Sequence, residues 1–400
     1  MEKKRMLRMQ LPCSECESGT PEEILANRRK VAAAHMREMG TFLWRAQEDV
    51  TYTLRDNILP EESDDGHRLS IRAGQLYQGI PYSFAGCAEA AFLDYAGEPD
   101  AQGIMPVSGL HWKLLSGSGK KTARIGNDCS SAVMQSWCQI GNSFRFTNTR
   151  YMVRDLGYLP VGSYISAPNE NASNRCTCRE NGEQTMFEAY ACLRLADALV
   201  CREDGAGHAI LAVSVEVVRR EDGTIDGDAS VLTFMEQSRV HLMQEKKYFH
   251  PELQENVYIT FVLDVKQTFR ELFEEGYLPV TCKELVDPAP VEVPTVWDSV
   301  ESPDGTTLLE GVISSNWAID CVAATITDAD GAAVQQGTVY APRDSRRYEM
   351  ELGQLAEEDP ERMRGRIAPE ELPAGGYRCV LRCRLTSGQV FTVRDFAFER

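Results

Sequence analysis

The stretch GNDCSSAV, residues 126–133, places a cysteine directly ahead of an apolar pattern at helical spacing. That spacing predicts a helix of about three turns that begins near Ser130. Asp128 and Ser130 carry side chains of the kind that cap a helix start. Cys129 would then lie at the positive end of the helix dipole, which favours the thiolate and so predicts a nucleophile. The alternative is a buried structural cysteine, the commoner state of a free cysteine.

A thiol nucleophile needs a base that holds its proton and a further group that orients the base. His208 is the preferred base, because it opens an apolar strand directly after a glycine-containing turn. Glu236 and Gln237 end a neighbouring predicted strand, and alternation directs only one of them at the site. A carboxylate and an amide oxygen can each accept the imidazole N–H, so both stay candidates, with Glu236 preferred. His241 lies in a polar stretch and carries no such signal.

Composition excludes several classes of protein. The chain has 400 residues, a length that predicts two or three domains. Hydrophobic residues make up 43% and charged residues 26%, as in soluble globular proteins. Its formal net charge of −18 argues against binding to nucleic acid or to anionic membranes. No apolar run is long enough to insert into a membrane. The basic N-terminus lacks the apolar core of a secretory signal, which predicts a cytoplasmic location; a start further upstream would allow the cell envelope or an extracellular location.

Thirteen cysteines at irregular spacings favour a reducing compartment over a disulfide framework. Cys13, Cys16, Cys176 and Cys178 offer four thiolates for a zinc ion, but the two pairs are far apart and lack neighbouring histidines. Surface thiols are the preferred interpretation of these four residues. We expect neither a metal nor an organic cofactor.

The order of predicted elements describes an α+β domain, with helices early and an antiparallel sheet late. Helices are predicted at 20–40, from an N-cap at Thr20 to a C-cap at Gly40, and at 183–193 and 267–276. Strands are predicted at 199–201, 208–215, 231–237 and 257–263. Loops are predicted at 74–86, 101–128 and 142–182. The aromatic loop 74–86 is typical of a cleft lining, although Tyr77 and Phe84 fit a buried turn equally well, and 142–182 is typical of a cleft wall or lid.

A proline-rich stretch at 287–294 predicts a stiff linker that ends this first domain, residues 1–286. Beyond it, residues 295–400 alternate between short strands and tight turns. Their length and pattern predict an all-β sandwich of immunoglobulin-like type. The partner of this second domain cannot be inferred from its residues, because such folds serve many functions.

Several motifs together resemble a known family. Pro81-Tyr82, Asp128-Cys129-Ser130, Asp197 and His208 occur in the order found in NlpC-type papain-like cysteine peptidases, of which the CHAP amidases are close cousins. The resemblance covers roughly residues 70–240. It implies an antiparallel sheet packed on the cysteine helix, and it implies hydrolysis of amide bonds in cell-wall stem peptides, often beside γ-D-glutamyl residues. It also implies that Tyr82, Asp128 and Ser130 bind the substrate. Ser131 and Ala196 stand where the family has glycine.

The sequence therefore predicts a cysteine peptidase or amidase in which Cys129 attacks a peptide substrate, derived from the cell wall. A transfer of the acyl group to an amine would use the same residues. The alternative is a catalytically silent papain-fold protein that binds a partner or has a structural role, with an accessory β-sandwich.

Overall fold

The computed structural model describes residues 17–54, 68–84, 86, 88–110, 112–115, 120–123, 126–153, 156–166, 173–203, 206–298, 310–341, 347–351 and 363–400. Over these ranges the fold is mixed α+β with several sheets, as the sequence predicts. Cys13 and Cys16 lie outside the described residues.

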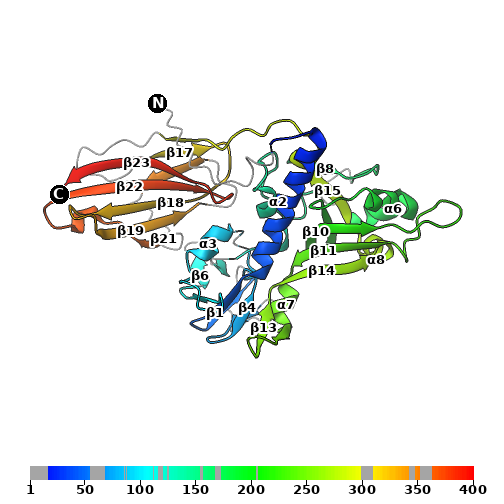
Figure 1. The fold of residues 1–400 in the computed structure, drawn as a ribbon, viewed down its shortest axis with the longest axis horizontal. Coiled ribbons are helices and arrows are strands. Elements are labelled where there is room, and N and C mark those ends of the chain that lie inside the picture. Colours follow the sequence, from blue (N-terminus) through cyan, green and yellow to red (C-terminus); the bar gives the residue numbers. More distant parts are fainter. Residues whose placement is uncertain are drawn as a thin grey trace.

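The long helix α2 (Pro21–Thr41) crosses the centre of the molecule (Figure 1). Its start is confirmed as predicted: the Thr20 hydroxyl accepts the Glu23 backbone N–H, and the Glu23 carboxylate accepts the Thr20 N–H at 2.8 Å. The helix ends one residue beyond the predicted Gly40. Its buried residues, among them Met36 and Met39, pack against the helix that begins at Cys129.

That second helix, α4 (Cys129–Trp137), is buried along its whole length. Asp128 caps it as predicted, because one carboxylate oxygen accepts the backbone N–H of Ser131 and the hydroxyl of Ser130, each at 2.7 Å. Gly126 is required just upstream, since a Cβ there would collide with the Pro81 carbonyl oxygen and its φ is 130°. The predicted helix is confirmed, and it starts at the cysteine itself.

A six-stranded antiparallel sheet supports α4. Its strand order is β14-β11-β10-β9-β15-β8, and α4 packs on the central pair β10 and β11. The strands are β8 (Tyr158–Pro160), β9 (Ala198–Glu203), β10 (Ala206–Glu216), β11 (Val231–Gln237), β14 (Phe261–Thr268) and β15 (Leu278–Cys282). The antiparallel sheet on the cysteine helix is what the sequence predicts, and the central strands are buried over residues 198–200, 209–212 and 232–235.

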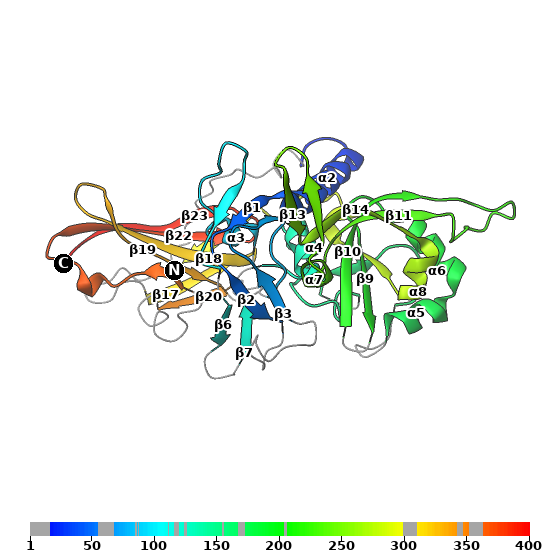
Figure 2. The ribbon, with the colours of Figure 1, turned by 90° about the horizontal axis from the view of Figure 1, so that it is seen from below.

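Three helices pack against the sheet on the side away from α2 (Figure 2). They are α5 (Asn174–Asn181), α6 (Glu183–Ala191) and α8 (Phe269–Glu275). The last two confirm the predicted helices. The prediction that 142–182 is irregular is wrong in part, because the segment contains β8 and α5. Helix α5 is too polar to show an apolar period, and its signals are the cap at Ser173 and Gly182 after its end.

A second, mixed sheet has the order β12-β13-β4-β1-β5 and was not predicted. Its strands are β1 (Leu43–Ala46), β4 (Leu76–Gln78), β5 (Met105–Val107), β12 (Lys247–His250) and β13 (Glu255–Ile259). Three predictions are wrong here. The predicted loop 74–86 includes β4. The loop 101–128 includes β5, and the single strand 257–263 is two strands that break at Thr260 and belong to different sheets. Each strand of this sheet is too short to show a clear alternation.

The C-terminal part forms two antiparallel sheets over one apolar core, at the opposite end of the molecule from the β10–β11 hairpin (Figure 2). One sheet has β16 (Val296–Asp298), β17 (Glu310–Ser315) and β20 (Arg347–Glu351). The other has β18 (Ile319–Thr327), β19 (Ala333–Tyr340), β21 (Met363–Arg366), β22 (Gly376–Leu385) and β23 (Val390–Glu399). The connection near 287 is fixed to α2, because Arg28 donates to the carbonyls of Glu284, Asp287 and Ala289.

Arg384 of β22 links this part to the rest of the molecule. Its two terminal nitrogens bind both carboxylate oxygens of Asp94 at 2.9 and 2.7 Å, and its Nε binds Asp320 at 2.6 Å. Asp94 directly follows helix α3 (Glu89–Leu93), and it also accepts the Tyr340 hydroxyl at 2.8 Å. Burial raises the pKa of Asp320, although the Arg384 guanidinium opposes this increase. The two carboxyl groups, Asp94 and Asp320, therefore depend on Arg384 to balance their charge.

Replacing Arg384 with methionine is expected to lower the free energy of unfolding by about 3–5 kcal/mol, because two carboxylates lose their cation in a buried setting. The matched control is Arg378→Met on the same strand, whose partner Asp395 is exposed. Urea unfolding followed by tryptophan fluorescence should separate the two variants. Equal losses in both would contradict the structural role given to Arg384.

Candidate active site

A cleft of about 990 Å³ opens at the start of α4. Its walls are the N-terminal end of α4, the segment that carries Tyr82 and Phe84, the beginning of β10, the end of β11 and the short helix α7 (Arg239–Met243). The residues predicted as nucleophile, base and orienting acid, which are Cys129, His208 and Glu236, all line it. Residues far apart in the chain therefore meet at one place.

The register of β10 and β11 explains why His208 meets Glu236. Ile210 lies opposite Glu236 in the antiparallel ladder, so His208 lies two residues further along and on the same face of the sheet. Such diagonal neighbours are within reach of long side chains. The imidazole Nε2 lies 2.6 Å from the Glu236 carboxylate oxygen Oε2. This geometry holds the histidine ring in one orientation.

His208 also contacts Cys129. Because Nε2 is engaged by Glu236, Nδ1 is the ring nitrogen left for the thiol. Burial by itself lowers the pKa of His208, but hydrogen bonds and charge interactions with Cys129 and Glu236 outweigh it and raise that pKa well above its usual value. Burial likewise raises the pKa of Glu236, and its two histidine neighbours outweigh that effect and bring the pKa well below the usual range. These directions favour an imidazolium on His208 beside a Glu236 carboxylate.

The two candidates for the orienting group point to opposite faces of the sheet. Glu236 faces His208, whereas the Gln237 side chain is fully buried and donates to the backbone carbonyls of Ile80 at 2.8 Å and Pro81 at 3.2 Å. The structure therefore does not bring Gln237 to His208, as alternation along the strand requires. The bonds of Gln237 instead hold the segment before Tyr82 against the sheet.

The three predicted substrate-binding residues line the cleft. Tyr82 is buried and interacts with Cys129, and its backbone is tied beside Asn127 by bonds of 2.9 and 3.0 Å between the two segments. Burial, together with the nearby Cys129 and Asp128, raises the pKa of Tyr82 far above its usual value. Ser130 and Asp128 bond to one another within the helix cap. The polar atoms of Asp128 and Ser130 thus form the cap of α4 beside the Cys129 thiol.

Asp197 has a structural position. One of its oxygens binds Arg29 of α2 at 2.9 Å, and the other accepts the Arg194 backbone N–H at 2.8 Å. The preceding Ala196 adopts a left-handed conformation with φ of 68°, which explains why a glycine would suit this turn. The turn therefore joins α2 to the start of β9, and its residues are not part of the cleft lining.

Comparisons with known protein families, with curated proteins and with solved structures find no match. None of the helices in the described part of the chain is both long and apolar enough to span a bilayer.

His241 is the residue at this site that the sequence argument missed. Its Nε2 lies 3.2 Å from Glu236 Oε1, the oxygen that His208 leaves free. In the sequence, His241 lies in a polar stretch without a motif around it. The available signal was Ser238, which caps α7 and thereby turns the chain back over the end of β11.

Cations also line the cleft. Arg202 comes from β9, Arg239 from the first turn of α7, and Lys246 from just beyond that helix. They lie beside Glu236 and Glu275, so the cleft carries both signs of charge in a chain whose net charge is −18. The cationic side chains suit the carboxylates of a ligand, and the acidic ones suit its amines.

The other described cysteines are free thiols in different settings. Burial raises the pKa of the Cys178 thiol to about 12, so the prediction of a surface thiol is wrong for Cys178, whereas Cys176 is exposed. Cys201 lies opposite His208 in the β9–β10 ladder, and burial raises its pKa too. Cys192 is exposed and serves below as a reference thiol.

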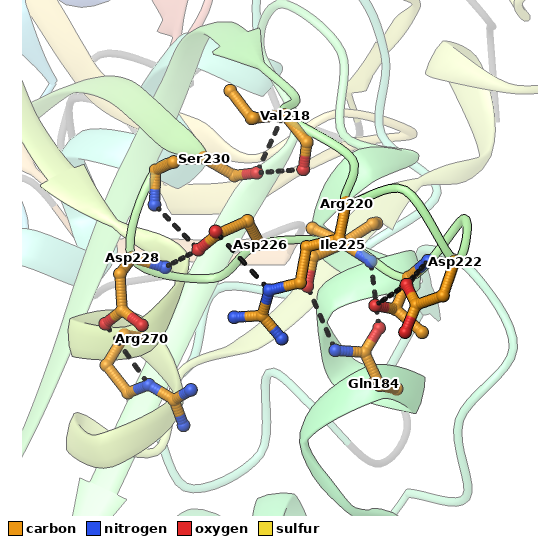
Figure 3. Close-up of polar contacts among 11 residues, drawn as sticks. Gln184, Val218, Arg220, Asp222, Ile225, Asp226, Asp228, Ser230 and Arg270 are labelled. Carbon is orange, nitrogen blue, oxygen red and sulfur yellow. Dashed lines mark hydrogen bonds and ion pairs between the residues drawn. The ribbon is translucent and has the colours of Figure 1, made fainter.

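Two other places in the described part of the chain bring polar or titratable side chains together. His35, Glu38 and Glu89 bring possible metal-ligand atoms within 4.8 Å of one another, the one such group among the described residues, and none of the three lines the cleft. A hollow of about 510 Å³ lies between α6 and the β10–β11 hairpin. Its polar groups are paired internally: Gln184 exchanges two 3.0 Å bonds with the Ile225 backbone, and Asp222 binds Thr224 (Figure 3). These bonds explain the shape of the hairpin.

Proposed function

We propose that this protein is a cysteine peptidase or amidase with a papain-like catalytic domain. Cys129 is the nucleophile, and His208 is the general base and acid. Glu236 orients the imidazole and raises its pKa. The observation that carries the proposal is the continuous contact from the Cys129 thiol through His208 to Glu236, at the start of a buried helix and on the wall of a cleft.

The proposed reaction is acyl transfer to water. His208 takes the Cys129 proton, and the thiolate attacks the amide carbonyl carbon. The backbone N–H of Cys129, at the start of α4, faces the developing oxyanion together with the helix dipole; a donor of this kind contributes about 3–4 kcal/mol. The C–N bond breaks as His208 gives its proton to the leaving amine. Water, deprotonated by His208, then hydrolyses the thioester and restores the thiol.

Two observations support a cell-wall stem peptide as substrate. The order of motifs from Pro81-Tyr82 to His208 resembles NlpC-type peptidases, which act on such peptides. Stem peptides carry several carboxylates, and the cleft offers Arg202, Arg239 and Lys246. Tyr82, Asp128 and Ser130 are placed beside the thiol, where they would meet the residue next to the scissile bond.

The C-terminal sheets fit an accessory domain of immunoglobulin-like type, and we propose residues 295–400 as its extent. The core of this part is its own, with Val322 and Leu381 at its centre. Two of its residues, Cys321 and Tyr340, pack instead into the core of the first part. Such an attachment suits a domain that holds the catalytic domain in a fixed orientation.

The proposal is tested by incubating the protein with defined stem peptides that differ in the γ-D-glutamyl bond, and by identifying the products by mass spectrometry. We expect a new amine and a new carboxylate at one bond, with Cys192→Ala as active as the unmodified chain. Hydrolysis of none of the peptides by a chain whose Cys129 is reactive would refute the stem-peptide substrate. An unreactive Cys129 would favour the alternative, a silent papain-fold binding protein.

A further inference from the structure

The Glu236 carboxylate lies between two imidazoles. Oε2 lies 2.6 Å from His208 Nε2, and Oε1 lies 3.2 Å from His241 Nε2. Each carboxylate oxygen therefore has its own histidine. The series Cys129–His208–Glu236 explains the contact of Glu236 with His208, but it does not explain the contact with His241.

In the hydrogen bond between His241 and Glu236, the donor can be assigned. His241 is 3% exposed, and its Nδ1 is buried without a hydrogen-bond partner among the described residues. The tautomer with the proton on Nε2 donates to Glu236 and leaves a bare acceptor at Nδ1. The opposite tautomer would bury an unpaired N–H and set a lone pair against a carboxylate, which costs more. His241 is therefore a hydrogen-bond donor to Glu236 through Nε2.

The backbone around His241 fixes the ring. Ser238 caps α7, because its hydroxyl accepts the Val240 backbone N–H, so the helix begins directly after β11. The His241 carbonyl accepts the Lys246 N–H at 2.9 Å, which closes the turn on the other side. A buried ring on a short, closed element can hold the carboxylate at one angle. Without it, Glu236 is free to rotate about its last torsion and leave His208.

We propose that His241 is a positioning residue, which holds the Glu236 carboxylate in the orientation that supports His208 and hence the reactive Cys129. The proposal rests on the proposed function, because it assigns His241 to the same thiol chemistry. His241 itself touches no reacting atom in this assignment.

The test measures the alkylation rate of each cysteine by iodoacetamide between pH 5 and pH 9, read by peptide mass spectrometry on the full chain. His241→Phe fills the space without a donor, and His241→Gln keeps an amide donor of similar reach. We expect the phenylalanine variant to lower the Cys129 rate at pH 6 about tenfold, as the loss of a supporting second contact commonly does. The glutamine variant should recover most of the rate. The Cys192 rate should stay the same in all chains.

Each outcome decides the matter. A Cys129 rate and pH profile in His241→Phe equal to those of the unmodified chain would overturn the positioning role alone. An equal loss of the Cys129 alkylation rate in both His241 variants, without rescue by glutamine, would show that His241 has a packing role. This result would also overturn the positioning role. If His241→Phe does not fold, His241→Asn replaces it, because the shorter amide cannot reach Glu236. An unmodified chain in which Cys129 reacts no faster than Cys192 would overturn the proposed function, and this proposal with it.

Discussion

Replacing Cys129 with alanine is expected to reduce amide hydrolysis to background, a loss of roughly 10⁵-fold or more in kcat, the scale on which a lost covalent nucleophile costs an enzyme. The physical reason is that no acyl intermediate can form. Cys201 lies opposite His208 in the β9–β10 ladder, but burial raises the pKa of its thiol, so it is a poor replacement. The measurement is turnover of the peptide that the unmodified chain cleaves fastest.

The control for this prediction is Cys192→Ala, since Cys192 is exposed and lies outside the cleft. It should keep full activity. Binding of the peptide to Cys129→Ala, followed by calorimetry, should remain near its original strength because the cations of the cleft are untouched. Undiminished turnover by Cys129→Ala would refute the assignment of the nucleophile.

Replacing Glu236 with glutamine is expected to lower kcat by about 10²- to 10⁴-fold, as the loss of an orienting carboxylate does in other triads. Burial lowers the pKa of His208, and contacts with Cys129 and Glu236 reverse this and raise it. Removing the Glu236 charge removes part of that increase, so His208 loses its proton at a lower pH. The alkaline limb of the pH–rate profile should therefore shift to lower pH.

The pH profile of kcat/KM, measured from pH 5 to pH 10, checks this direction. Glu188→Gln is a suitable control, because Glu188 forms an exposed pair with Arg219 far along the hairpin and should leave the profile unchanged. An alkaline limb that stays in place or moves to higher pH in Glu236→Gln would contradict the charge role of Glu236, even if the rate falls.

Local chemistry explains which parts of the site could be predicted from the sequence. Asp128 and Thr20 are cap residues whose side chains act on the next turn of their own helices, so short windows reveal them. Alternation along β11 predicts that only one of Glu236 and Gln237 reaches His208. It does not say which, because that depends on the register against β10, and register is a contact between distant segments.

Other features depend wholly on tertiary contacts. The mixed sheet is built from strands of three to five residues, such as β4, whose parallel partner β13 lies far along the chain. Arg384 reads as one of several arginines on β22, and only the approach of Asp94 distinguishes it. His241 acquires its position because α7 folds back over the end of β11. No local pattern encodes any of these contacts.

The contact between the Cys129 thiol and the His208 imidazole is tested most directly by the alkylation rate of Cys129 at pH 6, in the unmodified chain and in His208→Gln. If the two groups form a thiolate–imidazolium pair, Cys129 in the unmodified chain reacts well ahead of exposed Cys192, and the advantage disappears in His208→Gln. Equal Cys129 rates in the two chains, or a rate no higher than that of Cys192, would contradict the pair and the function built on it.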